Sequence, residues 1–132
     1  MRALLLWIGC LVVALAPATV HGADGDAPVA VTWQLVGNQA DNTYQAVLTL
    51  RNVSAQPLPE RWTLYFNTSS RLQPESLDDA YALEHINGDV YALRPAVDAV
   101  ALAAGERQNV AYTGGPRAIN VSEAPSGVYF VA

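Results

Sequence analysis

The chain has 132 residues, of which 52% are hydrophobic, and its seven arginines and twelve acidic residues give a net charge of −5 at pH 7. This length fits one domain. The acidic balance argues against nucleic acid and anionic membranes as partners, and a single cysteine, Cys10, excludes an internal disulfide.

The first residues have the pattern of a signal peptide. Met and Arg precede an uncharged apolar run over residues 3–15, and Pro17 and several small residues follow it. We predict a signal peptide over residues 1–22, cleaved after Gly22 or near Ala23. The protein is then expected to be exported, to the periplasm or the extracellular space, with residues 23–132 as the mature domain.

Two alternatives for this segment are less favoured. An uncleaved membrane anchor would need about 20 apolar residues, and Pro17 interrupts the run before that length. A lipoprotein signal ending at Cys10 would have almost no apolar stretch before it. After cleavage the mature part would keep six arginines against twelve carboxylates. This acidic excess predicts that the mature protein does not bind an anionic membrane.

The mature part has the period-two alternation of β-strands. Residues 31–36 and 44–52 form two such segments, joined by the turn-rich "GNQADN". Their apolar faces are Val31, Trp33 and Leu35 in the first segment and Tyr44, Ala46, Leu48 and Leu50 in the second.

Further strands are predicted at residues 62–67, 105–113 and 126–132, and none of the segments has a sustained helical period. Trp33 and Trp62 share faces with aliphatic or aromatic neighbours, which favours the core for both indoles. The economical architecture is an all-β fold, a two-sheet antiparallel β-sandwich.

"EHINGDVYALRP", residues 84–95, predicts a hairpin, because Asn-Gly between β-prone flanks favours a two-residue type I′ turn. Asn87 and Gly88 are then structural, and Pro95 closes the second strand. With that turn, one face would carry Leu83, His85, Val90 and Ala92, and the other Glu84, Ile86, Asp89, Tyr91 and Leu93.

The polar residues of this region offer little catalytic chemistry. His85 is the one histidine left after cleavage, and no cysteine accompanies it, so we predict no metal site and no cofactor. No Gly-x-Ser-x-Gly motif provides a nucleophile. The neighbours Asp78 and Asp79 are interpreted as turn caps or solvated carboxylates, so no catalytic residue is predicted.

Four ordered blocks carry a resemblance to a known family. "WTLYFNTSSRL", "LEHINGDVYALRP", "LAAGERQNVAYTG" and "INVSEAPSGVYFV" resemble the N-terminal domain of bacterial chitobiases and β-N-acetylhexosaminidases, over about residues 29–131. The resemblance implies a β-sandwich similar to cellulose-binding modules. It also implies that larger members carry an α+β domain and a catalytic (β/α)₈ barrel with an Asp-Glu pair.

That catalytic apparatus is not expected here. A barrel takes about 250 residues, and the mature chain has no Asp-Glu dipeptide. The chain is interpreted as a stand-alone module or as the head of a truncated enzyme.

A sugar-binding surface needs exposed aromatic rings, on which a pyranose stacks, and polar groups for its hydroxyls. Tyr65 is the leading candidate, because it shares the polar face of its strand with Asn67. The full set of sugar-binding candidates is Tyr65, Asn67, Tyr91, Tyr112 and Arg94. The alternative interpretation is that these tyrosines pack on a neighbouring domain or simply lie half-buried.

Three functions stay open at this stage. The first is a non-catalytic module that binds chitin or other glycans containing N-acetylglucosamine. The second is a structural domain that supports a catalytic glycoside hydrolase domain and binds no sugar. An active small hydrolase is the least favoured.

Overall fold

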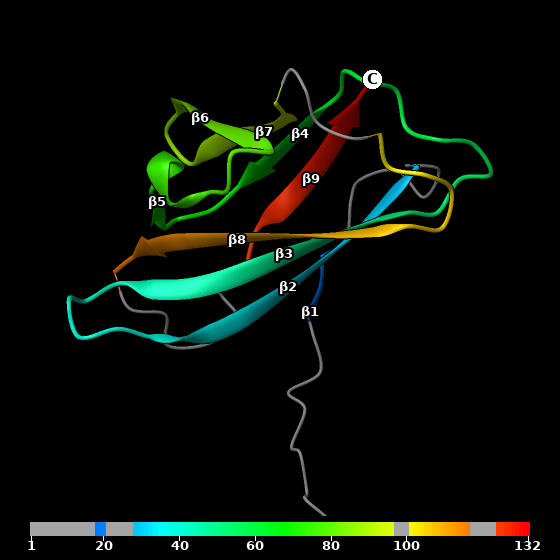
Figure 1. Ribbon diagram of the computed structural model, residues 1–132. Helices are drawn as coiled ribbons and strands as arrows, with labels where there is room; N and C mark the ends of the chain where they lie inside the picture. The colour runs from blue at the N-terminus through cyan, green and yellow to red at the C-terminus, as the bar shows by residue number, and fades with distance from the viewer. Residues whose placement is uncertain (1–17, 21–27, 97–100, 117–123) are drawn as a thin grey trace, which may run out of the picture.

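Alternation of apolar and polar residues along the strands builds two sheets that pack face to face. The structure, a computed structural model, describes residues 18–20, 28–96, 101–116 and 124–132, and Figure 1 shows its two layers. The predicted all-β, two-sheet antiparallel sandwich is confirmed.

The larger sheet has the strand order β1-β2-β3-β8-β5 over the described residues, and all its pairs are antiparallel. Its strands are β1 (Ala18–Val20), β2 (Val29–Asn38), β3 (Tyr44–Asn52), β5 (Arg71–Leu72) and β8 (Arg107–Gly115). The prediction for residues 44–52 matches β3, whereas β2 is longer than predicted and β8 begins two residues later. The short β5 was not predicted, because its two residues lie in a polar, turn-rich segment.

The smaller sheet has the order β6-β7-β4-β9 over the described residues. Its strands are β4 (Thr63–Asn67), β6 (Tyr81–Asn87), β7 (Val90–Pro95) and β9 (Ser126–Val131), and the 3₁₀ turn η1 (Pro74–Ser76) precedes β6. In Figure 1 this sheet lies above the larger one, and the C-terminus ends beside β9.

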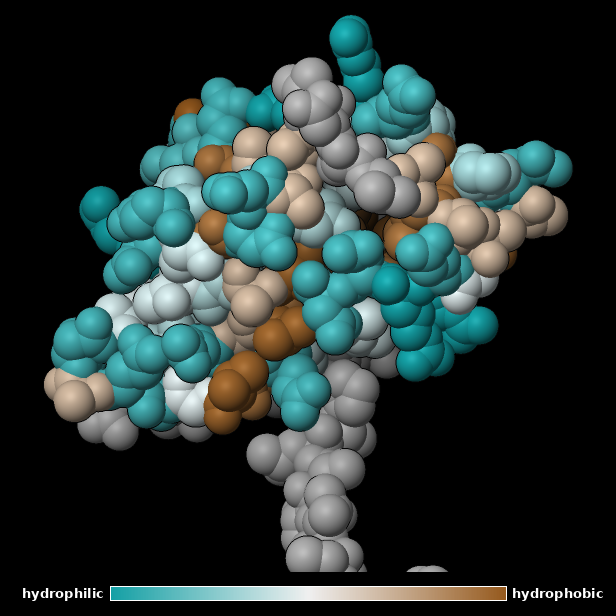
Figure 2. All heavy atoms as spheres, viewed as in Figure 1, coloured by the Kyte–Doolittle hydropathy of each residue, from teal (hydrophilic) through white to brown (hydrophobic). Residues whose placement is uncertain are grey.

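The core lies between the layers and consists of the inward residues of both sheets. Trp33 and Trp62 are 2% and 8% exposed, so their predicted core positions are confirmed. Figure 2, from the same side as Figure 1, shows hydrophobic residues at the middle of the molecule and hydrophilic ones around them. The largest fully buried side chains are Trp33, Tyr44, Phe66, Leu48, Leu50, Leu64, Leu93 and Asn52.

The edge strand β1 lies within the predicted signal peptide. It pairs antiparallel with Val31–Trp33 of β2. Cleavage after Gly22 or near Ala23 would therefore take an edge strand away with the leader. The rest of residues 1–22 and the cleavage positions lie outside the described residues, and the signal peptide stays a prediction.

The hairpin predicted at residues 84–95 forms, but its turn differs from the prediction. Asn87 belongs to β6 and pairs with Val90, so the two-residue loop is Gly88-Asp89. Gly88 has φ +47°, and Asn42 is the one non-glycine residue with positive φ among the described residues. Positive φ at the first loop position alone is the type II′ pattern, not type I′.

This shift in register changes the faces of the hairpin. The pairing is irregular between His85 and Asn87, where Ile86 is the extra residue. His85 therefore lies opposite Tyr91, and Leu83 lies opposite Leu93. The predicted faces were wrong because of this extra residue: moving a two-residue loop by one position keeps each side chain on its face, whereas one inserted residue on β6 reverses the faces relative to β7.

Candidate functional site

The outer face of the smaller sheet carries two tyrosines side by side. Tyr65 of β4 pairs directly with Tyr129 of β9. Their strand neighbours Leu64, Phe66 and Val128 point into the core, so both rings point outward. Tyr129 is 54% exposed and Tyr65 is half-buried.

An ion pair continues the same row across the sheet. Tyr65 lies opposite Ala92 of β7, and Ala92 lies opposite Glu84 of β6. Arg94, two residues beyond Ala92, donates from Nη1 to Glu84 Oε2 at 2.5 Å, and the two side chains are 39% and 58% exposed. This surface, made of Tyr65, Tyr129, Arg94 and Glu84, is called the tyrosine face below.

Arg94 joins the ion pair to the rings. Its hydrogen bond with Glu84 is the largest cause that raises the pKa of the guanidinium; burial opposes this rise, and a hydrogen bond with the side chain of Tyr65 adds a smaller contribution to it. A guanidinium has five donors in a fixed plane, so Arg94 keeps donors for a ligand beside the tyrosine rings.

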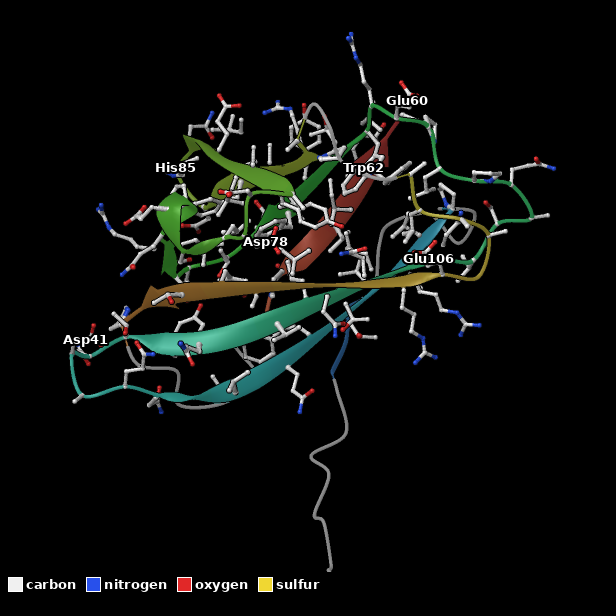
Figure 3. All side chains as sticks on the ribbon, viewed as in Figure 1. Asp41, Glu60, Trp62, Asp78, His85 and Glu106 are labelled. Atoms are coloured by element: carbon white, nitrogen blue, oxygen red, sulfur yellow. The ribbon has the colours of Figure 1, made fainter. Side chains whose placement is uncertain are left out.

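A hollow of about 530 Å³ opens at one end of the tyrosine face. Arg94, Thr63 and Val131 line it from the sheet, and Trp62 contributes an indole that is 8% exposed. Figure 3 shows Trp62 and Glu60 near this end of β4. Pockets that hold small ligands span about 300–1,000 Å³, and the volume of this hollow lies in that range.

The structure separates the five predicted sugar-binding candidates into two groups. Tyr65 and Arg94 lie on the tyrosine face, and Asn67 is exposed two residues beyond Tyr65 on the same strand. The amide of Asn67 packs against Gly127, where an added Cβ would lie 2.6 Å from Asn67 Nδ2.

Tyr91 and Tyr112 belong to the core, which corrects the prediction for both. Each is 4% exposed. The Tyr91 hydroxyl accepts from Leu72 N at 3.2 Å and donates to Ser70 O at 3.3 Å, so it joins β7 to the strand β5 of the other sheet. Polar neighbours in the sequence suggested exposure, but both tyrosines sit on the inward face of their strand.

Sequence reasoning missed Tyr129. Residues 126–132 read as almost wholly apolar, so no outward face was assigned there. The alternation of Val128, Tyr129 and Phe130 was the signal, because the first and last of these residues face the core.

The remaining polar residues of the hairpin region have local partners. His85 Nε2 donates to Gly88 O at 2.7 Å, and the His85 ring lies 4.8 Å from the ring of Tyr91. Asp78 Oδ1 accepts from Ala80 N at 2.6 Å, as a turn cap does. Among the described residues no three His, Cys, Asp or Glu side chains come together where they could hold a metal ion.

Comparison with protein families gives a match over residues 19–132, to CHB_HEX, described as "Putative carbohydrate binding domain". The chain belongs to this family, the N-terminal domain of chitobiases and hexosaminidases. The resemblance stated from the four sequence blocks is thereby confirmed. Comparison with curated proteins gives no match.

Solved structures share the fold at low identity. A GH20 exo β-N-acetylglucosaminidase from Vibrio harveyi is 24% identical with a TM-score of 0.59, over 69% of this chain and 13% of that one. Chitinase ChiA74 from Bacillus thuringiensis is 15% identical with a TM-score of 0.60, over 76% of this chain and 15% of that one. The chain thus matches a small part of both enzymes.

A separate small domain shares the fold as well. The chitin-binding domain of Chi18aC from Streptomyces coelicolor is 15% identical with a TM-score of 0.54, over 76% of this chain and 87% of that domain. Within the described part of this chain, no helix reaches the length and apolarity needed to cross a membrane.

Proposed function

We propose that the protein is an exported, non-catalytic module that binds chitin or other glycans containing N-acetylglucosamine through the tyrosine face. The observation that carries the proposal is the direct pairing of Tyr65 with Tyr129 beside the Arg94–Glu84 ion pair. Membership of the family of putative carbohydrate binding domains supports it.

The chemistry of the face suits a sugar. Two neighbouring tyrosine rings offer an apolar platform for the C–H face of pyranose units, and their hydroxyls keep a polar handle. The guanidinium of Arg94 supplies donors for hydroxyl or acetamido oxygens, and the carboxylate of Glu84 accepts from hydroxyls. Only binding is required of these groups, so no cofactor enters the proposal.

Calorimetry with chito-oligosaccharides, together with retention on chitin, tests the proposal. We expect Tyr129→Ala to weaken binding roughly 30-fold, because a central aromatic contact contributes about 2 kcal/mol. Val36→Ala is the matched control, since Val36 is 61% exposed but belongs to β2 of the other sheet. No heat and no retention for the unmodified protein, or equal effects of the two substitutions, would refute the proposal.

A second candidate is an accessory domain that supports a catalytic barrel and binds no sugar. This candidate is favoured by the match to the Vibrio harveyi enzyme, because the part of that enzyme that resembles this chain is 13% of a longer protein. Silent sugar titrations, combined with measurable association with a separately expressed GH20 barrel, would support this candidate over the first.

A further inference from the structure

The outer face of the larger sheet carries two arginines directly opposite each other. Arg51 of β3 pairs with Arg107 of β8, and both side chains are exposed. Like charges at directly opposite positions of a sheet repel each other and disfavour the pairing. The two arginines thus form a local positive site on a protein whose net charge is −5.

No carboxylate among the described residues offsets the two guanidinium groups. The one ion pair in the described part of the chain is Arg94–Glu84, on the other sheet. Glu106 precedes Arg107, but its Oε2 accepts from Ala103 N at 2.9 Å, and Figure 3 shows it at the start of β8. In the part of the chain that the structure describes, neither guanidinium is therefore neutralised by an ion pair.

The other outward side chains of the central strands β2, β3 and β8 are neutral. The outward positions of β2, β3 and β8 form cross-strand rows with Thr, Gln, Asn, Val and Ala side chains. In one row Thr49 Oγ1 donates to Asn109 Oδ1 at 2.8 Å. These outward positions include no aromatic ring, so the face lacks the platform on which sugars stack.

We propose that this surface, the arginine face, docks a protein surface that presents two or more Asp or Glu carboxylates. Guanidinium groups match carboxylates with two parallel hydrogen bonds, and arginine is enriched at protein interfaces. The neutral rows beside the pair give a partner uncharged side chains to pack on. The arginine face and the tyrosine face lie on opposite outer sides of the sandwich (Figure 1), so the two proposals are independent.

An octaglutamate peptide is the probe for the test, with octaglutamine as the uncharged control peptide. We expect the purified protein to bind octaglutamate at low ionic strength, with NMR shift changes centred on the amides around Arg51 and Arg107. The double variant Arg51→Gln/Arg107→Gln should bind about tenfold more weakly or worse, because opposite charges near the surface supply the attraction.

Arg71→Gln is the matched control, since Arg71 is an exposed arginine on β5 of the same sheet. This variant should keep the affinity of the unmodified protein. Chitin retention should stay unchanged in the double variant, which separates this test from that of the tyrosine face.

Several outcomes would overturn the proposal. These are no binding of octaglutamate, equal binding by the double variant, or an equal loss in Arg71→Gln. Tighter binding of polygalacturonate than of octaglutamate would point to an acidic polysaccharide instead. Self-association that the double variant abolishes would make a second copy of this chain the partner, against the proposal as stated.

Discussion

The indole Nε1 of Trp33 donates a 2.7 Å hydrogen bond to the hydroxyl oxygen of Tyr112, between residues 79 positions apart in the chain. Strand β3 separates β2 from β8, so the bond passes across the inner face of a neighbouring strand. The ring of Tyr44, from β3, lies edge-on to that of Tyr112, with centroids 6.4 Å apart. The three central strands thus share one aromatic cluster in the core.

Removal of the Tyr112 hydroxyl should destabilise the protein. Tyr112→Phe leaves a buried indole N–H without its acceptor, and such a group costs about 1–3 kcal/mol. Urea unfolding followed by tryptophan fluorescence measures the loss. Tyr129→Phe is the matched control, because Tyr129 is 54% exposed and the same deletion there should change stability by less than about 0.5 kcal/mol. Equal stabilities of the two variants would show that the hydrogen bond from Trp33 to Tyr112 does not stabilise the core.

Asn52 should be the polar residue whose loss costs most. It is fully buried, and its Nδ2 donates to Gln56 O at 2.7 Å and to Leu102 O at 3.1 Å. Its Oδ1 accepts from Ser54 N and Ser54 Oγ, at 3.0 and 2.6 Å. Asn52→Ala removes all four of these hydrogen bonds and leaves Ser54 N without its acceptor, while Leu102 O still accepts from Leu58 N and Gln56 O from Ser54 Oγ. We expect a loss of about 3 kcal/mol in unfolding free energy.

Thermal unfolding and hydrogen exchange check this expectation. Asn109→Ala is the control, since Asn109 is exposed and bonds with Thr49 alone in the described contacts. Faster exchange should be confined to the loops that Asn52 joins, around Ser54 and Leu102. Uniform loss of protection, or a melting temperature equal to that of the control, would show that Asn52 does not organise these loops.

The sequence predicted the fold well because alternation is a local signal. Each of the strands β2, β3, β4, β8 and β9 places apolar residues inward at every second position. The hairpin register was missed because an extra residue, Ile86, cannot be seen in a period-two pattern. One inserted residue reverses every side chain beyond it.

The candidate site was predicted in part for the same reason. Tyr65 stood out because its own strand alternates between core and polar residues. Its partner Tyr129 comes from a strand 64 positions later, and only the pairing of β4 with β9 brings the rings together. Non-local pairing of this kind leaves no mark in the local pattern of either strand.

Stability should fall at alkaline pH. Burial, with smaller contributions from Asp78 and Glu106, raises the pKa of Tyr81 to about 12, and burial together with the nearby Tyr44 raises the pKa of Tyr112. Unfolded tyrosine ionises near pH 10, roughly. The folded state therefore holds protons that the unfolded state has already lost above that pH, and the unfolding free energy decreases as pH rises.

Below about pH 9 this contribution should be complete and constant. Urea unfolding at a series of pH values between neutral and strongly alkaline measures it. Tyr81→Phe should make the alkaline decrease shallower, because it removes a group that ionises late in the folded state. A decrease of unchanged steepness in this variant would exclude Tyr81 as a cause.

Gly114 should not tolerate a side chain. It lies opposite Tyr44 in the pairing of β3 with β8. A Cβ at Gly114 would lie 2.7 Å from both Cζ and Oη of Tyr44 and 3.1 Å from Cδ2 of Leu72. Tyr44 is fully buried and cannot move aside, so Gly114→Ala should cost about 1–3 kcal/mol through overpacking.

Gly37→Ala is the matched control for this substitution. A Cβ at Gly37 meets nothing within 4 Å, and its φ does not lie in the left-handed region. We expect Gly37→Ala to change the unfolding free energy by less than about 0.5 kcal/mol in calorimetry or urea unfolding. If Gly114→Ala unfolds at the same temperature as Gly37→Ala, the ring of Tyr44 does not pack on β8 as the structure places it.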